Sequence, residues 1–409
     1  MYAMKNILNA LSNPDVNMVR IYGTGGIGKT TLSSATASTN NMEEIFAIRR
    51  EKDINNNEGT FQTEFKQSRS LSVNSLPKLT SFCSINSDKD RLDTCTPLFN
   101  KKNVEAMEDA RNRVNTLVRK LKDSSLLLDI SNYKFSVHDV IRDVGRSIAS
   151  RDGHMFTVTN NCVPRELTDK DILKNCIGIS LHNINELPKE FECPELKFFY
   201  MRTTTDDYSP VSDNFFAGML KLKVLHLVRL ELNSVPNSIR LLVNLRTLCI
   251  DDCKLRDIDF IGDIKQLEIL RICGSYSPEI KMFSKEMCNL IGLRYLDLKD
   301  LYNLRNISPN VLLTLSRLKE LYLPTNSHGR ECKIEWEVEG VNILDEWKHL
   351  MHLTALEISI PDANVLPKGR PLSNKLERYG ITFGNDVWNS FDGVASSRKV
   401  KLSLKSQHR

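Results

Sequence analysis

The stretch Leu245-Arg-Thr-Leu248-Cys-Ile250-Asp-Asp-Cys253-Lys-Leu255 decides how most of this 409-residue chain folds. Apolar and other residues alternate from Leu248 to Ile250, which predicts a short strand with one buried face. Cys253 follows in a position where a side chain can turn inward. Because one short strand cannot bury its apolar face alone, the stretch predicts stacking against similar units.

The same pattern, L-x-x-L-x-L with aliphatic or aromatic substitutes, recurs through the C-terminal half. Successive repeats start at Leu196, Leu222, Leu245, Leu267, Leu293, Leu318, Leu353 and Leu376. The starts are 22 to 26 residues apart except for one step of 35, which carries an insertion over 327–346. This period is typical of leucine-rich repeats. Between Leu196 and Ile381 lie 33 of the 52 leucines, so the repeats form a separate domain, with an earlier turn near Ile179.

Side chains on the strand face away from the core are the candidate binding residues. By alternation they are Val224, His226, Val228, Thr247, Cys249, Asp251, Ile269, Arg271, Cys273, Tyr295, Asp297, Lys299, Glu320 and Tyr322. Their mixed aromatic, aliphatic and two-signed character favours a protein partner over a polyanion. The alternative for any one of them is a side chain that only faces water.

A glycine-rich loop lies near the N-terminus. Gly23 to Thr30 matches G-x-x-x-x-G-K-[ST], after the largely apolar run Met18 to Tyr22 and before a predicted helix. Backbone N–H groups of such a loop can point at phosphate oxygens, with Lys29 neutralising the outer phosphates and Thr30 holding Mg. A plain glycine turn is the alternative. The candidate nucleotide-binding residues are Gly23, Thr24, Gly25, Gly26, Ile27, Gly28, Lys29, Thr30 and Thr31.

The middle of the chain predicts a helix, a hairpin and a second helix. Apolar residues at helical spacing over 104–122 indicate an amphipathic helix. A hairpin over 124–137 follows, with its turn at Ser131-Asn132, and His138-Asp139 opens the second helix. This order suggests a winged-helix unit. Leu126 to Asp129 also imitates a Walker B strand, although the hairpin interpretation already uses it.

These motifs together resemble plant nucleotide-binding leucine-rich-repeat (NB-ARC) disease resistance proteins of the coiled-coil class. The stretch from Asn9 through the glycine loop to Leu32 is similar to the beginning of their nucleotide domain. Val137-His138-Asp139 resembles their Met-His-Asp motif, with Val137 replacing Met. The resemblance implies an intracellular immune receptor that is held inactive with ADP and activated by ATP, with His138 reading the ADP phosphates.

The chain also departs from that family. Only about 100 residues separate the loop from the winged-helix unit, and they do not supply the Walker B strand and helical subdomain of the family. The N-terminal coiled coil is also missing, which suggests a truncated or chimeric product. The predicted fold class is therefore α/β, an incomplete P-loop NTPase fragment and winged-helix unit followed by a leucine-rich-repeat solenoid. The predicted domains are 1–45 (P-loop fragment), 46–103 (polar, partly repeat-like, loosely ordered connector), 104–160 (winged-helix unit), 175–395 (solenoid) and 396–409 (basic tail).

The predicted function is an ADP- or ATP-binding switch, with Mg, coupled to recognition of a pathogen effector or guarded host protein on the concave repeat face. No useful ATP hydrolysis is expected, because no clear Walker B acid follows the loop. The alternative is a nucleotide-independent repeat module that only binds protein. A winged-helix DNA binder is disfavoured, because the aspartates beside Arg142 and Arg146 cancel a basic patch.

Composition further narrows the class of protein and the cellular compartment that the sequence predicts. Lys plus Arg is 56 and Asp plus Glu is 51, a balance that does not point to nucleic acid. No apolar run is long enough to span a bilayer, and Met1 to Pro14 does not look like a signal peptide, which predicts a cytoplasmic protein. The ten cysteines contain no C-x-x-C pair, so neither a zinc site nor a disulfide framework is expected.

Overall fold

The structure is a computed structural model in which the chain forms two compact units, Met1–Thr157 and Val158–Arg409. It describes residues 18–21, 45–51, 60–66, 107–124, 126–131, 134–137, 145, 155–159, 173–182, 191–203, 211–232, 235–274, 277, 279–325, 334–361, 365–366, 375–384 and 398–402.

Three strands of the first unit form an antiparallel sheet. They are β1 (Met18–Ile21), β2 (Ile45–Glu51) and β3 (Thr60–Lys66), in the order β1-β3-β2. β1 confirms the strand predicted before the glycine loop, but its neighbour β3 runs antiparallel to it, whereas a P-loop domain is built on a parallel sheet. The prediction of a loosely ordered connector over 46–103 is wrong for β2 and β3, whose β-branched and aromatic residues favour extended pairing.

A helix and a hairpin complete the described part of this unit. α5 (Met107–Asp123) confirms the predicted amphipathic helix, and β4 (Leu128–Ser131) pairs antiparallel with β5 (Lys134–Ser136) as the predicted hairpin. The buried residues Val114, Val118 and Leu121 of the helix pack with Leu127, which immediately precedes β4. This apolar cluster therefore holds the helix against the beginning of the hairpin.

The structure does not test the second helix of the predicted winged-helix unit. The second helix, with His138 and Asp139 before it, lies outside the described residues apart from Gly145. Asp129 pairs with Phe135 across the hairpin. Because a Walker B strand lies within a parallel sheet, this antiparallel pairing favours the hairpin interpretation of Leu126 to Asp129.

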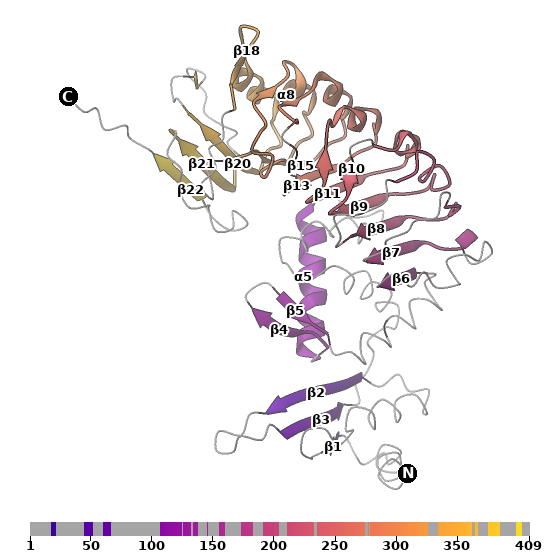
Figure 1. Ribbon diagram of the computed structural model, residues 1–409. Coiled ribbons are helices and arrows are strands. Elements are labelled where there is room, and N and C mark those ends of the chain that lie inside the picture. The colour runs from indigo at the N-terminus through magenta and orange to yellow at the C-terminus, as the bar shows by residue number, and fades with distance from the viewer. Residues whose placement is uncertain are drawn as a thin grey trace. The chain divides into compact units, whose positions relative to one another are not determined.

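An eleven-stranded sheet runs through the second unit, with its strands following an arc (Figure 1). In chain order its strands are β6 (Met155–Thr159), β7 (Gly178–His182), β8 (Phe198–Arg202), β9 (Val224–Val228), β11 (Thr247–Asp251), β13 (Ile269–Cys273), β15 (Tyr295–Asp297), β17 (Glu320–Tyr322), β20 (Ala355–Ile360), β21 (Arg378–Phe383) and β22 (Arg398–Leu402). Neighbouring strands from β7 to β22 pair in parallel.

The strand positions confirm the predicted repeat register. Within the eleven-stranded sheet, each strand from β8 to β21 begins two residues after one of the eight starting leucines. β7 confirms the earlier turn near Ile179. The core-facing leucines of consecutive strands stack with no exposed surface and are Leu225, Leu248, Leu270, Leu296, Leu321 and Leu356. Since burying one such side chain stabilises a fold by about 1.5 to 3 kcal/mol, this column is a major source of solenoid stability.

Both ends of the sheet extend beyond the predicted solenoid. β22 pairs with β21 from Tyr379↔Arg398 to Phe383↔Leu402, so the prediction of a basic tail over 396–409 is wrong for this strand. The alternation Lys399-Val400-Lys401-Leu402 suits a strand at the edge of a sheet. β6, predicted within the winged-helix unit, occupies the other edge of the sheet.

Cys253 closes a turn, as its position in the repeat predicted. Its buried Sγ accepts a hydrogen bond from the Leu230 backbone N–H at 3.3 Å and contacts the Leu227 carbonyl oxygen at 3.7 Å. Burial raises the pKa of the Cys253 thiol to about 12, so Sγ stays protonated and can donate to that carbonyl. One side chain thereby ties its own turn to the preceding one.

Short elements cover the outer side of the turns. They are the 3-10 helices η4 (Asn237–Leu241), η5 (Asp259–Asp263), η6 (Lys285–Asn289) and η7 (Ile343–His349), helix α8 (Val311–Thr314), and the strand pairs β10 (Glu231–Leu232) with β12 (Lys254–Leu255), β14 (Met282–Phe283) with β16 (Asn306–Ile307), and β18 (Glu337–Val338) with β19 (Val341–Asn342). The β18–β19 hairpin lies within the predicted insertion.

Helix α8 is capped by a side chain of the next turn. Buried Glu346 accepts hydrogen bonds from the Asn310 and Leu313 N–H groups at 2.5 and 3.1 Å, at the beginning of α8.

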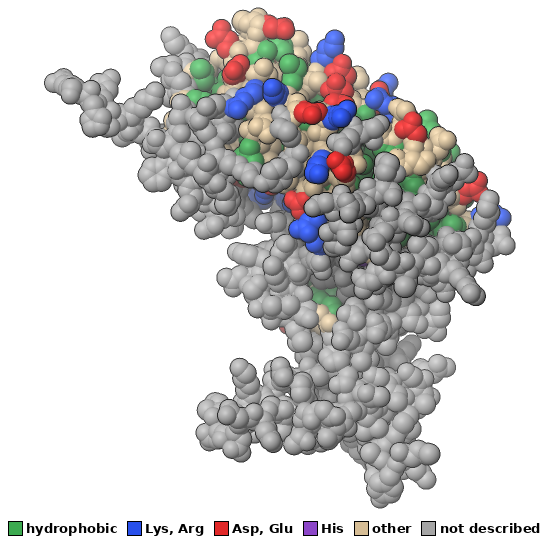
Figure 2. Space-filling view, in the orientation of Figure 1, with side chains coloured by type: hydrophobic (Ala, Val, Ile, Leu, Met, Phe, Trp, Pro, Cys, Tyr) green, Lys and Arg blue, Asp and Glu red, His purple; other side chains and the backbone are tan. Residues whose placement is uncertain are grey.

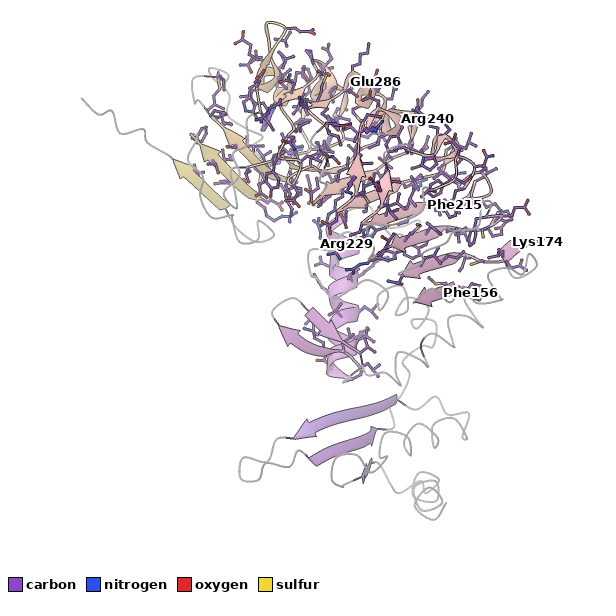
Figure 3. All side chains as sticks on the ribbon, viewed as in Figure 1. Phe156, Lys174, Phe215, Arg229, Arg240 and Glu286 are labelled. Atoms are coloured by element: carbon purple, nitrogen blue, oxygen red, sulfur yellow. The ribbon has the colours of Figure 1, made fainter. Side chains whose placement is uncertain are left out.

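An aromatic cluster fills the core near β8. Phe199 packs edge-on against Phe215 and Phe216 at centroid distances of 5.8 and 6.3 Å, while Phe191 stacks on Phe215 at 5.8 Å. Phe215 is labelled in Figure 3. These side chains are buried. They replace the leucines of later turns and close the core at this end with large rings.

Three consecutive turns leave their strands through a residue with positive φ. These residues are Arg229 (φ 56°), Asp252 (φ 54°) and Gly274 (φ 62°). Only the glycine has no Cβ, and a Cβ at Gly274 would lie 2.0 Å from Oδ1 of Asp252. Glycine in the third turn therefore adopts this φ without the steric cost that Arg229 and Asp252 bear, and it leaves room for the Asp252 side chain.

We expect Gly274→Ala to lower the free energy of unfolding by about 1 to 3 kcal/mol, since it adopts an unfavourable φ and displaces the Asp252 carboxylate from its place beside Arg229. Gly340→Ala is the matched control, because Gly340 has φ 76° but no atom within 4 Å of its Cβ position. Urea unfolding followed by circular dichroism measures both. Equal losses in the two variants would contradict the packing role of Gly274.

Candidate binding face

The strand register gathers the predicted outward-facing residues on one face of the sheet, which we call the inner face. His226, Cys249 and Arg271 are aligned partners on β9, β11 and β13, and Asp297 continues the row on β15. Thr247 lies between Val224 and Ile269 in the same way. The sequence-based assignment of these residues to one face is therefore confirmed.

Their exposure differs from the expectation. Apart from the half-buried Lys299, every one of the predicted outward-facing residues is buried. Thr247 is only 1% exposed and Asp251 only 3%. The alternative interpretation, in which such a side chain only faces water, is therefore wrong for the buried ones. These side chains bury one another, because charged and aromatic groups on adjacent strands, about 4.8 Å apart, pack against each other.

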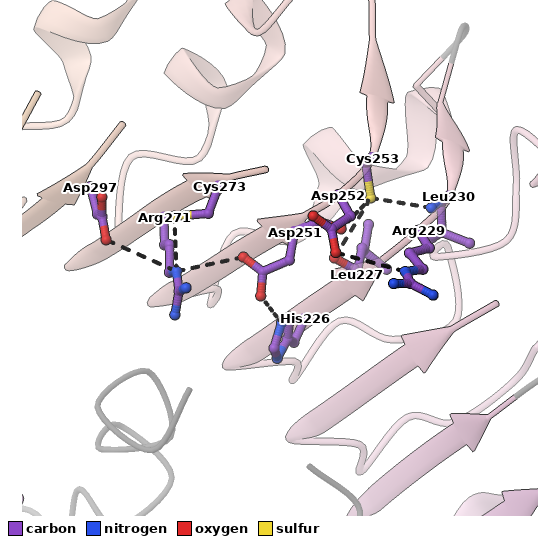
Figure 4. Close-up of polar contacts among 10 residues, drawn as sticks. All are labelled: His226, Leu227, Arg229, Leu230, Asp251, Asp252, Cys253, Arg271, Cys273 and Asp297. Atoms are coloured by element: carbon purple, nitrogen blue, oxygen red, sulfur yellow. Dashed lines mark hydrogen bonds and ion pairs between the residues drawn. The ribbon is translucent and has the colours of Figure 1, made fainter. Parts of the chain in front are cut away.

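A row of ionisable side chains, in which acidic and basic groups alternate, crosses β9, β11, β13 and β15 (Figure 4). His226 Nε2 lies 2.8 Å from Oδ2 of Asp251, and Nε of Arg271 lies 3.5 Å from the other Asp251 oxygen. The same Nε lies 4.0 Å from Oδ2 of Asp297 and 3.1 Å from Sγ of Cys273. Arg271 thus lies between two buried carboxylates, an arrangement that compensates for burying its charge.

Burial and neighbouring charges set the protonation of this row. Burial would lower the pKa of Arg271, but Cys273 and the two carboxylates outweigh it and raise that pKa well above its ordinary value. Burial raises the pKa of Asp297, against the lowering effect of Lys299 and Arg271. Burial also would lower the pKa of Lys299, but Asp297 raises it. Arg271 and Lys299 therefore keep their protons throughout the physiological range.

A second polar group lies on the C-terminal strands. Tyr322 Oη donates to Glu320 at 2.8 Å, and Arg378 Nη2 donates to the other Glu320 oxygen at 3.0 Å. Tyr295 Oη donates to Asp297 at 3.1 Å, and its ring lies 5.5 Å from that of Tyr322. Two tyrosines thereby connect this group with the row centred on Arg271.

The two ends of the inner face differ in chemistry. On β8 and β9 it presents mainly aromatic and aliphatic groups, with Tyr200 packed edge-on against His226 at 5.0 Å. From β13 to β21 charged and phenolic groups dominate. Tyr200, Glu357 and Arg378 were missed from sequence, although extending the same alternation to β8, β20 and β21 would have found them.

The surface of the outer turns mixes both charge signs. Figure 2 shows Lys and Arg beside Asp and Glu across the described surface in that view. Among the described residues no group of three His, Cys, Asp or Glu side chains could hold a metal ion. No helix in the described ranges is both long and apolar enough to cross a bilayer.

The predicted nucleotide-binding residues lie elsewhere in the chain. Gly23 to Thr31, including Lys29 and the proposed metal ligand Thr30, and His138 fall outside the described residues. The nucleotide site therefore stays a prediction.

Comparison with known proteins places the repeats in context. The repeat half forms a leucine-rich-repeat solenoid. No protein-family model matches the chain. Over 225 residues it is 26% identical to a probable disease resistance protein of Arabidopsis thaliana, a match that covers 47% of this chain. The chain spans only 26% of the length of that relative.

Two solved structures are also similar over 56% of the chain. One is a leucine-rich-repeat protein of Leptospira interrogans, with 19% identity, a TM-score of 0.32 and 67% of that chain covered. The other is the plant peptide hormone receptor RGFR1 in complex with RGF2, with 18% identity, a TM-score of 0.32 and 38% of that chain covered. The solenoid assignment rests on the strand register and the stacked leucines of this chain.

Proposed function

We propose that this chain acts in plant disease resistance, with the solenoid recognising a protein partner on its inner face. The observation that carries the proposal is the strand register, which gathers tyrosine, arginine and carboxylate groups of successive turns on one inner face, where Lys299 and Arg378 keep partial exposure. Tyrosine and arginine are the residues that most often dominate protein interfaces. The similarity to a plant disease resistance protein supports the biological setting.

The proposed partner is a pathogen effector or a host protein that the receptor guards. A partner segment with apolar side chains at one end and charged side chains at the other would match both ends of the inner face. Lys299 and Arg378, which keep partial exposure, would meet its carboxylates. The setting proposed for this recognition is the cytoplasm.

The second part of the proposal is nucleotide control. Gly23 to Thr31 would hold ADP or ATP, with Lys29 on the outer phosphates, Thr30 on Mg, and His138 reading the ADP phosphates. The motif in the sequence supports this part. A repeat module that binds protein without any nucleotide is the alternative, and the antiparallel neighbour of β1 favours it.

We expect Lys29→Ala to weaken ADP binding by the full chain roughly 10- to 100-fold, because it removes charge-assisted hydrogen bonds to phosphate. Lys120→Ala, on the exposed side of α5, is the control and should bind as wild type. Equilibrium binding of labelled ADP with Mg measures both. Unchanged affinity in Lys29→Ala, or no ADP binding by the folded wild type, would favour the nucleotide-independent module.

A further inference from the structure

One flank of the solenoid forms a continuous column at the point where the chain enters each strand. We define the leading flank as the two residues before and the one residue after each starting leucine. The residue after each leucine donates its backbone N–H to the equivalent carbonyl of the preceding turn, as from Lys223 to Lys197 (2.9 Å) and from Arg246 to Lys223 (2.9 Å). The same bond continues through Glu268, Arg294 and Lys319 at 2.8 Å. Side chains of successive turns therefore stand side by side along this flank.

The leading flank concentrates positive charge. In the six turns that start from Leu196 to Leu318 it holds eight cations and two carboxylates. The cations are Lys197, Lys221, Lys223, Arg246, Lys265, Arg294, Arg317 and Lys319, and the carboxylates are Glu195 and Glu268. The whole chain has only five more Lys and Arg than Asp and Glu. The excess on this flank alone is thus at least as large as that of the complete chain.

The two carboxylates neutralise only part of this charge. Glu195 pairs with Lys221 at 2.5 Å, and Glu268 pairs with Arg246 and, at 4.0 Å, with Arg294. The other five cations of the flank have no carboxylate within ion-pair distance among the described residues. Like charges held about 4.8 Å apart by the strand spacing repel each other and attract a polyanionic surface.

Exposed aliphatic side chains lie in the same column. Leu220, Val243 and Ile291 each stand two residues before a starting leucine and are 52%, 61% and 64% exposed. Met351 stands two residues before Leu353, which starts the turn after the insertion, and is 67% exposed. Asn244 Nδ2 donates to the Leu220 carbonyl at 2.8 Å, which ties the turn that starts at Leu245 to the turn that starts at Leu222. These four side chains form an apolar row, interrupted by Lys265 and Ser316, beside the cations.

The position of these rows suits a flat partner. A solenoid curves toward its inner face, so its flank follows the arc and presents successive turns to one side. The strands β7 to β21 follow such an arc (Figure 1). A planar surface can therefore touch several turns at once, whereas a single extended chain would have to bend along the arc.

We propose that the leading flank docks on the surface of an anionic lipid bilayer. Lys and Arg side chains are attracted to anionic headgroups, and aliphatic side chains gain free energy by entering the boundary with the acyl chains. Single-stranded nucleic acid is a poorer match, since it is held by aromatic stacking and the flank positions of these turns carry no aromatic side chain. An acidic polypeptide would use the cations but not the aliphatic row.

Vesicle sedimentation of the full chain tests this proposal. We expect binding to vesicles of phosphatidylcholine with phosphatidylserine, no binding to phosphatidylcholine alone, and weaker binding at higher salt. The triple variant Lys223→Gln, Arg317→Gln and Lys319→Gln should lose binding roughly 100-fold, given the contribution of each cation near such a surface. The triple control Arg256→Gln, Lys281→Gln and Lys285→Gln removes three exposed cations outside the flank and should bind as wild type.

A second variant tests the aliphatic row. Val243→Ser, Ile291→Ser and Met351→Ser together should also weaken vesicle binding, with thermal melts showing that every variant stays folded. Equal losses in the flank and control charge variants would overturn the proposal, as would a folded wild type that ignores anionic vesicles. Binding of labelled polyglutamate without vesicle binding would also overturn it and point to an acidic polypeptide. None of these outcomes depends on ADP or on a partner at the inner face.

Discussion

Leu248→Asp is expected to unfold the solenoid. Leu248 has no exposed surface and stacks between Leu225 and Leu270 of the adjacent strands. The substitution removes an apolar contact worth about 2 to 5 kcal/mol. It also puts a carboxylate into a dry core, which costs several further kcal/mol. Their sum rivals the whole stability of an ordinary domain, about 5 to 15 kcal/mol.

Val243→Asp is the matched control for this experiment. It places the same charge in the same turn, but Val243 is 61% exposed and lies outside the leucine column. We expect its melting temperature, followed by circular dichroism, to stay within a few degrees of wild type. A Leu248→Asp protein that melts like the Val243→Asp protein would show that the strand register is wrong.

Arg271→Met is expected to lower the free energy of unfolding by about 3 to 5 kcal/mol, because it leaves buried carboxylates without their cation. Asp251 and Asp297 approach the Arg271 guanidinium from the two neighbouring strands. Methionine keeps much of the length of the side chain, so a loss reports mainly the charge. Arg256→Met, at an exposed position, is the control and should change stability by less than about 0.5 kcal/mol.

A double substitution separates charge from shape in this prediction. Adding Asp297→Asn to Arg271→Met removes one of the carboxylates left without a cation and should restore part of the lost stability. Urea unfolding of the two single variants and the double variant gives the coupling energy. Strictly additive losses would mean that Arg271 does not stabilise the sheet through Asp297.

The repeat sequence determined the strands because its information is local. A leucine two residues before each strand and the alternation within it were enough to place β8 to β21, and the same alternation put His226, Asp251, Arg271 and Asp297 on one face. Burial of those groups could not be read in this way. It depends on side chains 20 to 26 residues apart in the sequence meeting across strands, as Arg271 does with Asp251 and Asp297.

Predictions outside the repeats had a weaker basis. α5 showed clear helical spacing, and its prediction was confirmed. β2 and β3 are short, isolated strands in a polar stretch and pair only with each other and β1, so no period marks them. β22 was missed because lysines occupy alternate positions of an edge strand, and the same composition is typical of a solvated terminus.

The charge row of Figure 4 limits how this gene can change in length. Repeat arrays can gain or lose whole units by recombination only where any unit tolerates any neighbour. Here Asp251, Arg271 and Asp297 belong to three successive turns. Loss of the middle one would leave two acidic turns adjacent, about 4.8 Å apart, with no cation between them. Selection should therefore preserve the number and order of turns around Arg271 and concentrate length variation elsewhere, such as at the β18–β19 insertion.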